Sequence, residues 1–253
     1  MDVTSFITAS DASSKAFKTA TLLKTLTVNA LIMGEDGVGK ENLAKFILPD
    51  ASLLDASNFD ELLVALQSST QIIILNIDSS PNIKRLIEAI NKNSVRVIAT
   101  SRQSFANEDI DEIFSIKFDI PPLSERPEDV ALLVQKFAIE AASTFGGKET
   151  LSLDNFVPDL SHNASSLRRQ VMINYLLQDI NDVELMGIIE NYLRDKIGSN
   201  SDYRNFLYLY EVPLIKSGLK KFKSQLKLSD KLGLNRNTLR KKIADNKQYL
   251  VGE

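Results

Sequence analysis

The chain has 253 residues, of which 43% are hydrophobic and 25% are charged, as is usual for soluble globular proteins of two or three domains. It contains no cysteine, which excludes disulfides and cysteine-based metal sites and fits a reducing, cytoplasmic location. The most apolar run, residues 72–75, is far too short to cross a bilayer, and the N-terminus lacks the basic and apolar regions of a signal peptide. We therefore expect a cytoplasmic protein with no membrane partner.

A glycine-rich loop between a predicted strand and a predicted helix is the first functional motif along the chain. The strand is the apolar run 29–33, and apolar residues at helical spacing follow the loop from Leu43 onward. In this context glycines let backbone N–H groups close around phosphate oxygens, and Lys40 supplies a positive charge. The predicted nucleotide-binding residues are Gly34, Glu35, Asp36, Gly37, Val38, Gly39, Lys40 and Glu41. The general pattern has Ser or Thr in the place of Glu41, and a simple glycine turn is the alternative.

Strands and helices alternate through the next part of the chain. Residues 71–78 and 95–100 are predicted strands, and 82–91 is a predicted helix. This alternation indicates an α/β fold with a mostly parallel sheet and helices on both faces. From Arg126 onward the pattern turns helical, with apolar stripes at Val130, Leu133, Val134 and Phe137 and at Leu167, Val171 and Tyr175. A helical subdomain is therefore expected to follow the sheet.

Three segments of this part resemble the AAA+ ATPase domain of NtrC-type bacterial enhancer-binding proteins, the sigma-54 activators. Residues 34–41 are similar to the family's GESGTGKE, including the glutamate after the lysine. PPLSERPEDV at 121–130 resembles the family's PPLRERREDI, and VRVIATSR at 95–102 resembles its VRVIAATNR. The resemblance implies an AAA+ P-loop domain over residues 1–140 and a helical lid over 141–197. It also implies ATP or ADP as the ligand, with no metal beyond the magnesium that accompanies a nucleotide.

The loop with which this family grips the sigma factor, GAFTGA, has no counterpart in this sequence. Only about thirty residues separate Lys40 from the strand at Ile72, which is too few to include such a loop. We therefore do not expect contact with sigma-54 or activation of its polymerase.

The positions that support hydrolysis in this family also hold other residues. The family's acidic pair, which holds magnesium and activates water, aligns with Asn76 and Ile77. Its two arginines that reach a neighbouring subunit align with Ala106 and Glu112. The arginine with which its lid senses the nucleotide aligns near Ser165. Without a carboxylate to orient water, hydrolysis loses its base and part of its metal site. We therefore assign no catalytic residue and expect a degenerate ATPase. A working ATPase that uses Asp78 for metal and Arg168 or Arg169 for sensing is the alternative.

The C-terminal segment, residues 201–253, carries the pattern of a helix-turn-helix. Gly233 can end one helix and Asn235 can cap the next, on which Leu239 and Ile243 share the buried face. The other faces of the second helix carry side chains that pair with base edges and phosphates. The predicted DNA-binding residues are Asn235, Arg236, Asn237, Thr238, Arg240, Lys241 and Lys242. The alternative is a solvated basic helix at a chain end.

Two stretches of this segment resemble Fis-type DNA-binding domains. Residues 233–243 are similar to the end of the family's LGINRNTLRKKL, and residues 207–215 resemble its apolar helix with the E-x-P-L-L segment. The sequence departs from the family at 223–225, where Gly-Asn-Gln is usual, and at 228–229, where two alanines are usual. The larger Leu228 is expected to change how the two helices of the motif pack. The resemblance implies that residues 201–253 are a Fis-type domain that binds double-stranded DNA.

The distribution of charge agrees with this interpretation. Residues 201–253 contain 12 basic and 5 acidic side chains, while the remaining residues contain 18 basic and 28 acidic ones. A basic C-terminal segment after an acidic remainder is expected when one domain binds nucleic acid and the other does not. The polar run at 198–202 is the expected linker between the two.

We therefore predict a bacterial transcription regulator that binds DNA as a homodimer, because one recognition helix reads few base pairs and two-fold pairing adds a second half-site. The candidate dimer surface is the helix that carries Phe206, Leu207, Tyr210, Leu214 and Ile215. Two alternatives are an active AAA+ ATPase regulator and an interaction protein that modulates full-length enhancer-binding proteins.

Overall fold

The structure is a computed structural model, and it describes residues 6–102, 108–146 and 156–250. The chain divides into two compact units, Met1–Ile180 and Asn181–Glu253. This division comes before the polar run at 198–202 and places helix α8 (Asp182–Leu193) in the second unit. The boundaries of the functional domains stay a prediction.

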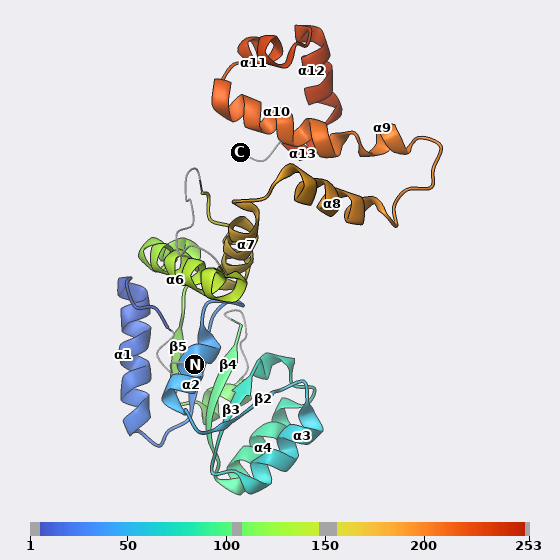
Figure 1. Ribbon diagram of the computed structural model, residues 1–253. Coiled ribbons are helices and arrows are strands. Elements are labelled where there is room, and N and C mark those ends of the chain that lie inside the picture. The colour runs from blue at the N-terminus through green and yellow to red at the C-terminus, as the bar shows by residue number, and fades with distance from the viewer. Residues whose placement is uncertain (1–5, 103–107, 147–155, 251–253) are drawn as a thin grey trace. The chain divides into compact units, whose positions relative to one another are not determined.

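Five parallel strands form one sheet in the first unit, in the order β2-β3-β4-β1-β5 (Figure 1). They are β1 (Ala30–Met33), β2 (Ser52–Asp55), β3 (Gln71–Leu75), β4 (Arg96–Ser101) and β5 (Ile116–Asp119). β1 lies between β4 and β5, with Ala30 in register with Ile98 on one side and with Ile116 on the other. The predicted parallel α/β sheet is therefore confirmed.

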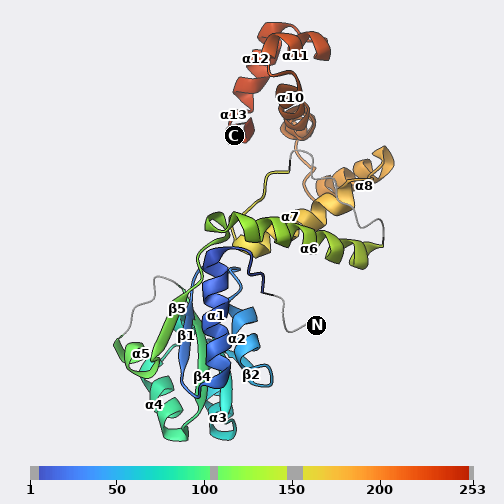
Figure 2. The same cartoon turned by 90° about the vertical axis from the view of Figure 1, so that its left-hand side faces the viewer.

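Helices cover both faces of this sheet, as Figures 1 and 2 show. They are α1 (Asp11–Thr25), α2 (Lys40–Ile47), α3 (Phe59–Ser68), α4 (Ile83–Asn93) and α5 (Glu108–Ile113). Along β3, Ile73 packs with α1 and α2, while Ile72 and Ile74 pack with α3, α4 and α5. Because side chains alternate between the two faces of a strand, a continuous isoleucine run fills both halves of the core.

Strand β3 is shorter than the strand predicted at 71–78. It ends at Leu75 because Asn76 adopts the left-handed conformation, with a φ of 50°, and a 3-10 turn, Ile77–Ser79, follows. Asparagine tolerates this conformation better than most residues. The turn therefore changes the direction of the backbone at the edge where a ligand is expected in parallel sheets.

Two long helices follow the sheet and lie side by side: α6 (Pro127–Phe145) and α7 (Asn163–Leu177) (Figure 2). A short 3-10 turn, Leu123–Glu125, precedes α6. Val134 and Phe137 of α6 pack with Leu167 and Val171 of α7, so the two apolar stripes predicted from the sequence face each other.

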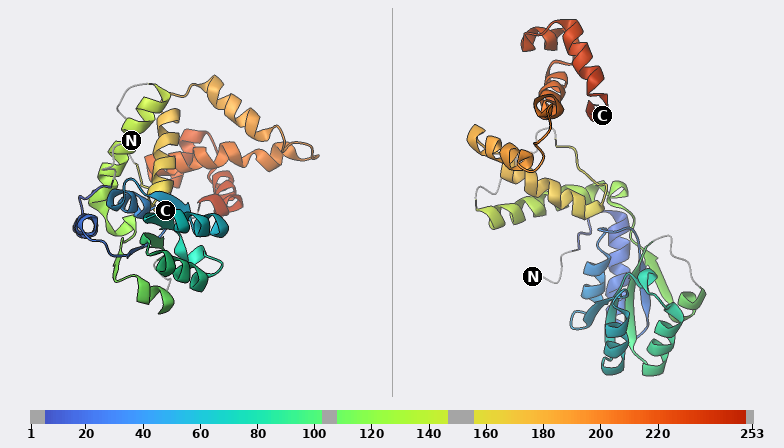
Figure 3. Two further views of the ribbon diagram at one scale, coloured as in Figure 1. Left: turned by 90° about the horizontal axis from the view of Figure 1, so that it is seen from below. Right: turned by 90° about the vertical axis from the view of Figure 1, so that its right-hand side faces the viewer.

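The second unit is entirely helical in its described part (Figure 3). After α8 come α9 (Asp202–Phe206), α10 (Tyr208–Phe222), α11 (Gln225–Leu232), α12 (Arg236–Asp245) and α13 (Lys247–Leu250). Its small core consists of Ile215, Leu228 and Leu239, one residue from each of α10, α11 and α12. Across the described residues of both units, no helix is long and apolar enough to span a membrane.

Candidate functional site

The glycine-rich loop joins the end of β1 to the start of α2. At Gly34 the φ is 145°, and a Cβ there would lie 2.5 Å from the carbonyl oxygen of Ile120. At Gly37 the φ is 79°, and a Cβ would lie 2.6 Å from the carbonyl oxygen of His162. Both contacts are with backbone, which cannot move aside, so only glycine fits at these positions.

The first turn of α2 offers its backbone amides to a ligand. Gly39 is the N-cap residue, and it has no side chain with which to cap the helix. The N–H groups of a first turn have no partner within the helix, and the helix dipole favours an anion beside them. The loop 34–41 and this turn therefore form a cradle of the kind that binds phosphate.

Lys40 lies inside this loop with 7% of its side chain exposed. Its Nζ donates hydrogen bonds to the carbonyl oxygens of Gly34 and Glu35, at 2.5 and 3.0 Å, and lies 3.7 Å from a carboxylate oxygen of Asp36. Burial lowers the pKa of Lys40, and the nearby Asp36 opposes that shift. An ammonium group held mainly by carbonyls is suited to take an anionic partner.

A cleft of about 370 Å³ opens beside the loop, a volume in the range of small-molecule sites. Its lining includes Gly37 to Asn42 of the loop and α2, together with Asn76 and Thr100 near the ends of β3 and β4. An apolar wall of the cleft includes Phe6, Ile7, Leu123 and Leu133. The sequence did not indicate this wall. Phe6 and Ile7 precede α1, and no local pattern relates them to the glycine loop.

The cleft holds an amide where a catalytic carboxylate would be expected. Asn76 donates its backbone N–H to Thr100 Oγ1 at 3.0 Å and its side-chain amide to Asp55 at 2.7 Å. Hydrogen bonds from Ser57 and Asn76 outweigh the effect of burial and lower the pKa of Asp55. Ile77 is fully buried in the core. Neither residue can orient water as a carboxylate does.

Asp78 lies in the turn after β3 and is not among the residues that line the cleft. One of its carboxylate oxygens is 3.9 Å from Arg102 Nε, and the other has no hydrogen-bond partner within the described part of the chain. Its charge acts on Lys40 from a distance.

The residues considered for nucleotide sensing lie in different places. Ser165 lines the cleft. Arg168 instead donates to both carboxylate oxygens of Glu140 on α6, which lowers the pKa of Glu140. Arg169 is not among the residues that line the cleft, and Glu112 is exposed on α5. Ala106 lies outside the described residues.

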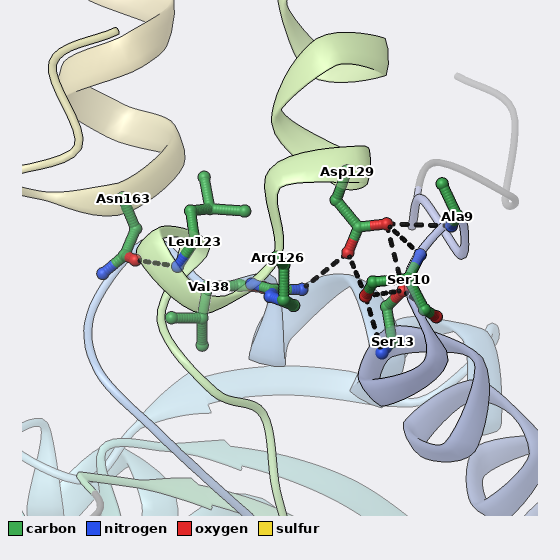
Figure 4. A network of polar contacts seen from close by, with 8 residues as sticks. All are labelled: Ala9, Ser10, Ser13, Val38, Leu123, Arg126, Asp129 and Asn163. Atoms are coloured by element: carbon green, nitrogen blue, oxygen red, sulfur yellow. Dashed lines mark hydrogen bonds and ion pairs between the residues drawn. The ribbon is translucent and has the colours of Figure 1, made fainter.

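Arg126 and Asp129, which also line the cleft, form a buried ion pair (Figure 4). These side chains are 2% and 1% exposed and 3.4 Å apart. Arg126 Nη2 donates to the carbonyl oxygen of Val38 in the glycine loop at 3.1 Å. Burial lowers the pKa of Arg126, and Asp129 opposes that shift. Both residues fall in the segment 121–130, but residue type alone did not reveal their contacts.

Asn163, at the start of α7, connects that helix to the glycine loop. Its side-chain amide donates to the carbonyl oxygen of Asp36 at 3.0 Å and to a carboxylate oxygen of Glu35 at 2.9 Å. Its side-chain oxygen accepts from the N–H of Leu123 at 2.7 Å (Figure 4). The start of α7 and the loop are therefore joined by partly buried hydrogen bonds, which the sequence did not predict.

In the second unit, α11 and α12 form two short helices joined by a tight turn. Gly233 ends α11 with a φ of 63°. Asn235 caps α12, and its side-chain oxygen accepts from the N–H of Asn237 at 2.8 Å. Leu239 is fully buried against Leu228, so the α12 face that carries it is fixed to the core.

Most of the predicted DNA-binding side chains are exposed around this fixed face. The exposed ones are Asn235, Arg236, Asn237, Thr238, Arg240 and Lys241. Lys242 is half-buried and forms an ion pair with Glu211 of α10. The structure thus gives α12 one apolar face and a broad polar, basic face.

The packing of α10 against α11 depends on the larger residue noted in the sequence. Leu228 is fully buried and lies directly over Gly218, where an added Cβ would overlap the Leu228 Cδ1. Gly218 thus provides the space that Leu228 fills.

An apolar groove of about 700 Å³ runs over α8, α9 and α10. It is lined mainly by Leu185, Ile189, Leu193, Phe206, Leu207, Tyr210 and Leu214. The other residue considered for this surface, Ile215, is 1% exposed and belongs to the core instead.

No family model matches the chain. It is 28% identical over 202 residues to NtrC of Azospirillum brasilense, a DNA-binding transcriptional regulator, and the match covers 61% of this chain and 42% of that protein. Its fold resembles crystal structures of NtrX from Brucella abortus with ATP, at a TM-score of 0.61 and 16% identity, and with ADP, at 0.60 and 17%. Each similarity covers nearly all of this chain, 95% and 94%, and 69% of NtrX.

Part of the chain is thus similar in sequence to NtrC, and its fold is similar to that of NtrX. Its sheet, with helices on both faces and a helical C-terminal region, is the AAA+ α/β fold predicted from the sequence. The chain spans less than half the length of the curated relative that it matches.

Proposed function

We propose that the chain is a DNA-binding bacterial transcription regulator whose AAA+ domain holds a nucleotide as a ligand and does not activate sigma-54 polymerase. The observation that carries this proposal is α12, which Asn235 caps and Leu239 fixes to the core, so that a basic face points to solvent. A helix-turn-helix needs this arrangement, with an apolar face that locks the second helix and a polar face for the major groove. The similarity to NtrC supports the proposal.

The exposed residues of α12 divide into two roles. Arg236, Asn237 and Arg240 carry side chains that match guanine and adenine edges. Lys241 carries a point charge suited to a phosphate. The ion pair of Lys242 with Glu211 fixes the angle of α12 on α10, so we assign Lys242 an orienting role beside its contact with DNA.

The apolar groove over α8, α9 and α10 is the proposed homodimer surface. Leucine, isoleucine and aromatic side chains line it almost without interruption. A contiguous apolar surface of this kind is expected to be covered by another protein. To read two half-sites one turn of DNA apart, a second copy related by a two-fold axis has to place its α12 about 34–36 Å from the first.

The glycine loop is the proposed nucleotide site, with Lys40 and the amides of residues 37–41 on the phosphates. Lys40 would exchange the carbonyls of Gly34 and Glu35 for phosphate oxygens. The apolar wall with Phe6, Ile7 and Leu133 then takes the base. The NtrX crystal structures with ATP and ADP support this assignment.

We propose that this nucleotide is held rather than hydrolysed. Asn76 and Ile77 supply no carboxylate, Asp78 does not line the cleft, and Arg168 is engaged with Glu140. Hydrolysis needs a group that orients water and a full set of charges around the γ-phosphate. ATP or ADP would act as an effector, and only through a difference in affinity between two states of the protein.

The proposed loss of sigma-54 activation rests on the short connection between α2 and β3. β2 and α3 follow one another there with only brief turns. This short connection supports the absence of a sigma-gripping loop.

Selection of duplexes from a random-sequence pool, followed by fluorescence anisotropy, tests the proposal. We expect the purified chain to enrich a site with two half-sites about one turn apart. It should bind this site at least ~10³-fold more tightly than a scrambled duplex at physiological salt. The double variant Arg236→Ala with Arg240→Ala should lose this preference. Equal affinity for selected and scrambled duplexes would contradict sequence-specific regulation.

A further inference from the structure

One wall of the nucleotide cleft comes from a segment that belongs to no helix or strand. Phe6 and Ile7 line the cleft, and α1 begins only at Asp11. The Phe6 ring packs directly on the glycine loop, because a Cβ at Gly39 would lie 2.9 Å from it. No helix or strand holds this wall, so its position depends on the packing of Phe6 against the core beside α1 and α2 and on contacts with the backbone that follows it.

Asp129 holds this segment with both of its carboxylate oxygens (Figure 4). The backbone amides of Ala9 and Ser10 donate to Oδ1 at 2.8 and 2.9 Å, and the Ser13 hydroxyl donates to it at 3.0 Å. The Ser10 hydroxyl donates to Oδ2 at 3.0 Å. These contacts join residues about 120 positions apart in the sequence. A fully buried carboxylate thus fixes the backbone that immediately follows Phe6 and Ile7.

The partner of Asp129 reaches the phosphate side of the same cleft. Arg126 donates to the carbonyl oxygen of Val38, inside the glycine loop, and lies 3.4 Å from Asp129. Its Nε has no hydrogen-bond partner within the described residues. A buried ion pair that leaves an N–H unpaired is a poor source of stability. Its geometry instead keeps the apolar wall and the phosphate loop at a fixed separation.

We propose that Asp129 is a positioning residue that fixes residues 6–10 as the base-binding wall of the nucleotide cleft. The inference rests on the proposed binding of nucleotide at the glycine loop. Asp129 acts through Phe6 and Ile7, which contact the base, and Arg126 couples this wall to the loop that holds the phosphates. The base-dependent part of the affinity therefore depends on Asp129, and the phosphate-dependent part depends on Lys40.

Calorimetric titration with ATP and with inorganic tripolyphosphate separates these two parts. Asp129→Asn keeps the size of the side chain but removes the charge that accepts the two amides. We expect this substitution to weaken the affinity for ATP by about tenfold or more, because it removes a charged hydrogen-bond acceptor. Tripolyphosphate, which has no base, should bind within about twofold of the wild type. Lys40→Ala should abolish the binding of both ligands.

Glu128→Gln is the matched control, because Glu128 is the neighbouring carboxylate in the first turn of α6 and is exposed. It removes the same charge from the same helix end and should leave both affinities unchanged. Equal losses of ATP and tripolyphosphate in Asp129→Asn, or no loss of either, would overturn the inference while leaving nucleotide binding intact. If the wild-type protein binds neither ligand, the proposed nucleotide site itself fails.

Hydrogen exchange of the nucleotide-free protein tests the positioning without any ligand. In Asp129→Asn the amides of Ala9 and Ser10 should exchange faster, while those of β1 and β4 keep their protection. If Asp129→Asn does not fold, the double variant Ser10→Ala with Ser13→Ala removes two hydroxyl donors and keeps the ion pair. It should show the same selective loss of ATP affinity. Unchanged exchange in residues 6–13 of a folded variant would overturn the positioning role.

Discussion

At the scale of single residues, Lys40 is the side chain on which the proposed nucleotide binding depends. Its ammonium lies among backbone carbonyls and is mostly excluded from solvent, so burial lowers its pKa. Phosphate binding requires the charged form. The affinity for nucleotide is therefore complete at a pH below the Lys40 pKa of the free protein and is lost as the pH rises through that value.

A pH series of ATP titrations tests this dependence. An ordinary lysine titrates near ~10.4, and we expect the ATP affinity of this protein to begin falling at a lower pH. Lys40→Arg is the control, because a guanidinium stays charged throughout this range and its remaining affinity should not change with pH. An affinity that falls no earlier than the ionisation of an ordinary lysine, or that falls equally in Lys40→Arg, would refute the role of Lys40 ionisation.

Arg240 and Lys227 should affect DNA binding in different ways. Arg240→Ala on α12 should weaken the selected site by about 1–3 kcal/mol and scrambled DNA much less, because it removes a base contact. Lys227→Ala on α11 should weaken both duplexes alike and reduce the slope of affinity against salt by about one, because it removes a phosphate contact. Anisotropy titrations at several salt concentrations distinguish the two. Equal losses on both duplexes for Arg240→Ala would argue against base reading.

Residue patterns predicted the glycine loop and the exposed face of α12, because local spacing determines both. They did not predict the roles of Phe6, Asp129 and Asn163. Those roles arise from contacts between distant parts of the chain, such as the amide of Ala9 with Asp129. A buried aspartate in the first turn of a helix looks the same in sequence as an exposed one, and Glu128 beside it is exposed.

At the scale of elements, the contact of α10 with α11 depends on a matched pair, Gly218 and Leu228. Gly218→Ala should destabilise the second unit by about 1–3 kcal/mol through overpacking, and Leu228→Ala should do so by about 2–5 kcal/mol through a cavity. The double variant should cost clearly less than the sum, because the new methyl group fills part of the cavity. Urea unfolding followed by tyrosine fluorescence measures this, since five of the six tyrosines lie in the second unit. Additive losses would mean that the two positions are not coupled.

Long periodic elements were easier to predict than short ones. The helix predicted at 82–91 is observed as α4, with Asn82 as its N-cap. The four-residue strands β2 and β5 were not predicted, because four residues carry too little periodicity. β3 ends three residues before the predicted strand because Asn76 takes the left-handed conformation, which side-chain hydrophobicity does not signal.

At the scale of the whole molecule, dimerisation through the apolar groove is what would bring two recognition helices onto one site. Ile189→Asp places a charge in that groove and should convert a dimer to a monomer, as measured by sedimentation equilibrium. Its affinity for the two-half-site duplex should fall more than tenfold. Val64→Asp, on the exposed side of α3, is the matched control and should change neither property. A dimer that persists in Ile189→Asp would place the interface elsewhere.

We propose above all that this AAA+ domain binds nucleotide as a ligand without hydrolysing it. The most direct test combines calorimetric titration with ATP and measurement of phosphate release on the same preparation, with Lys40→Ala as the control. We expect saturable binding that Lys40→Ala abolishes, and phosphate release no faster than in that variant. Phosphate release that depends on Lys40 would contradict it and favour an active ATPase, and an absence of ATP binding would contradict the role of nucleotide as a ligand.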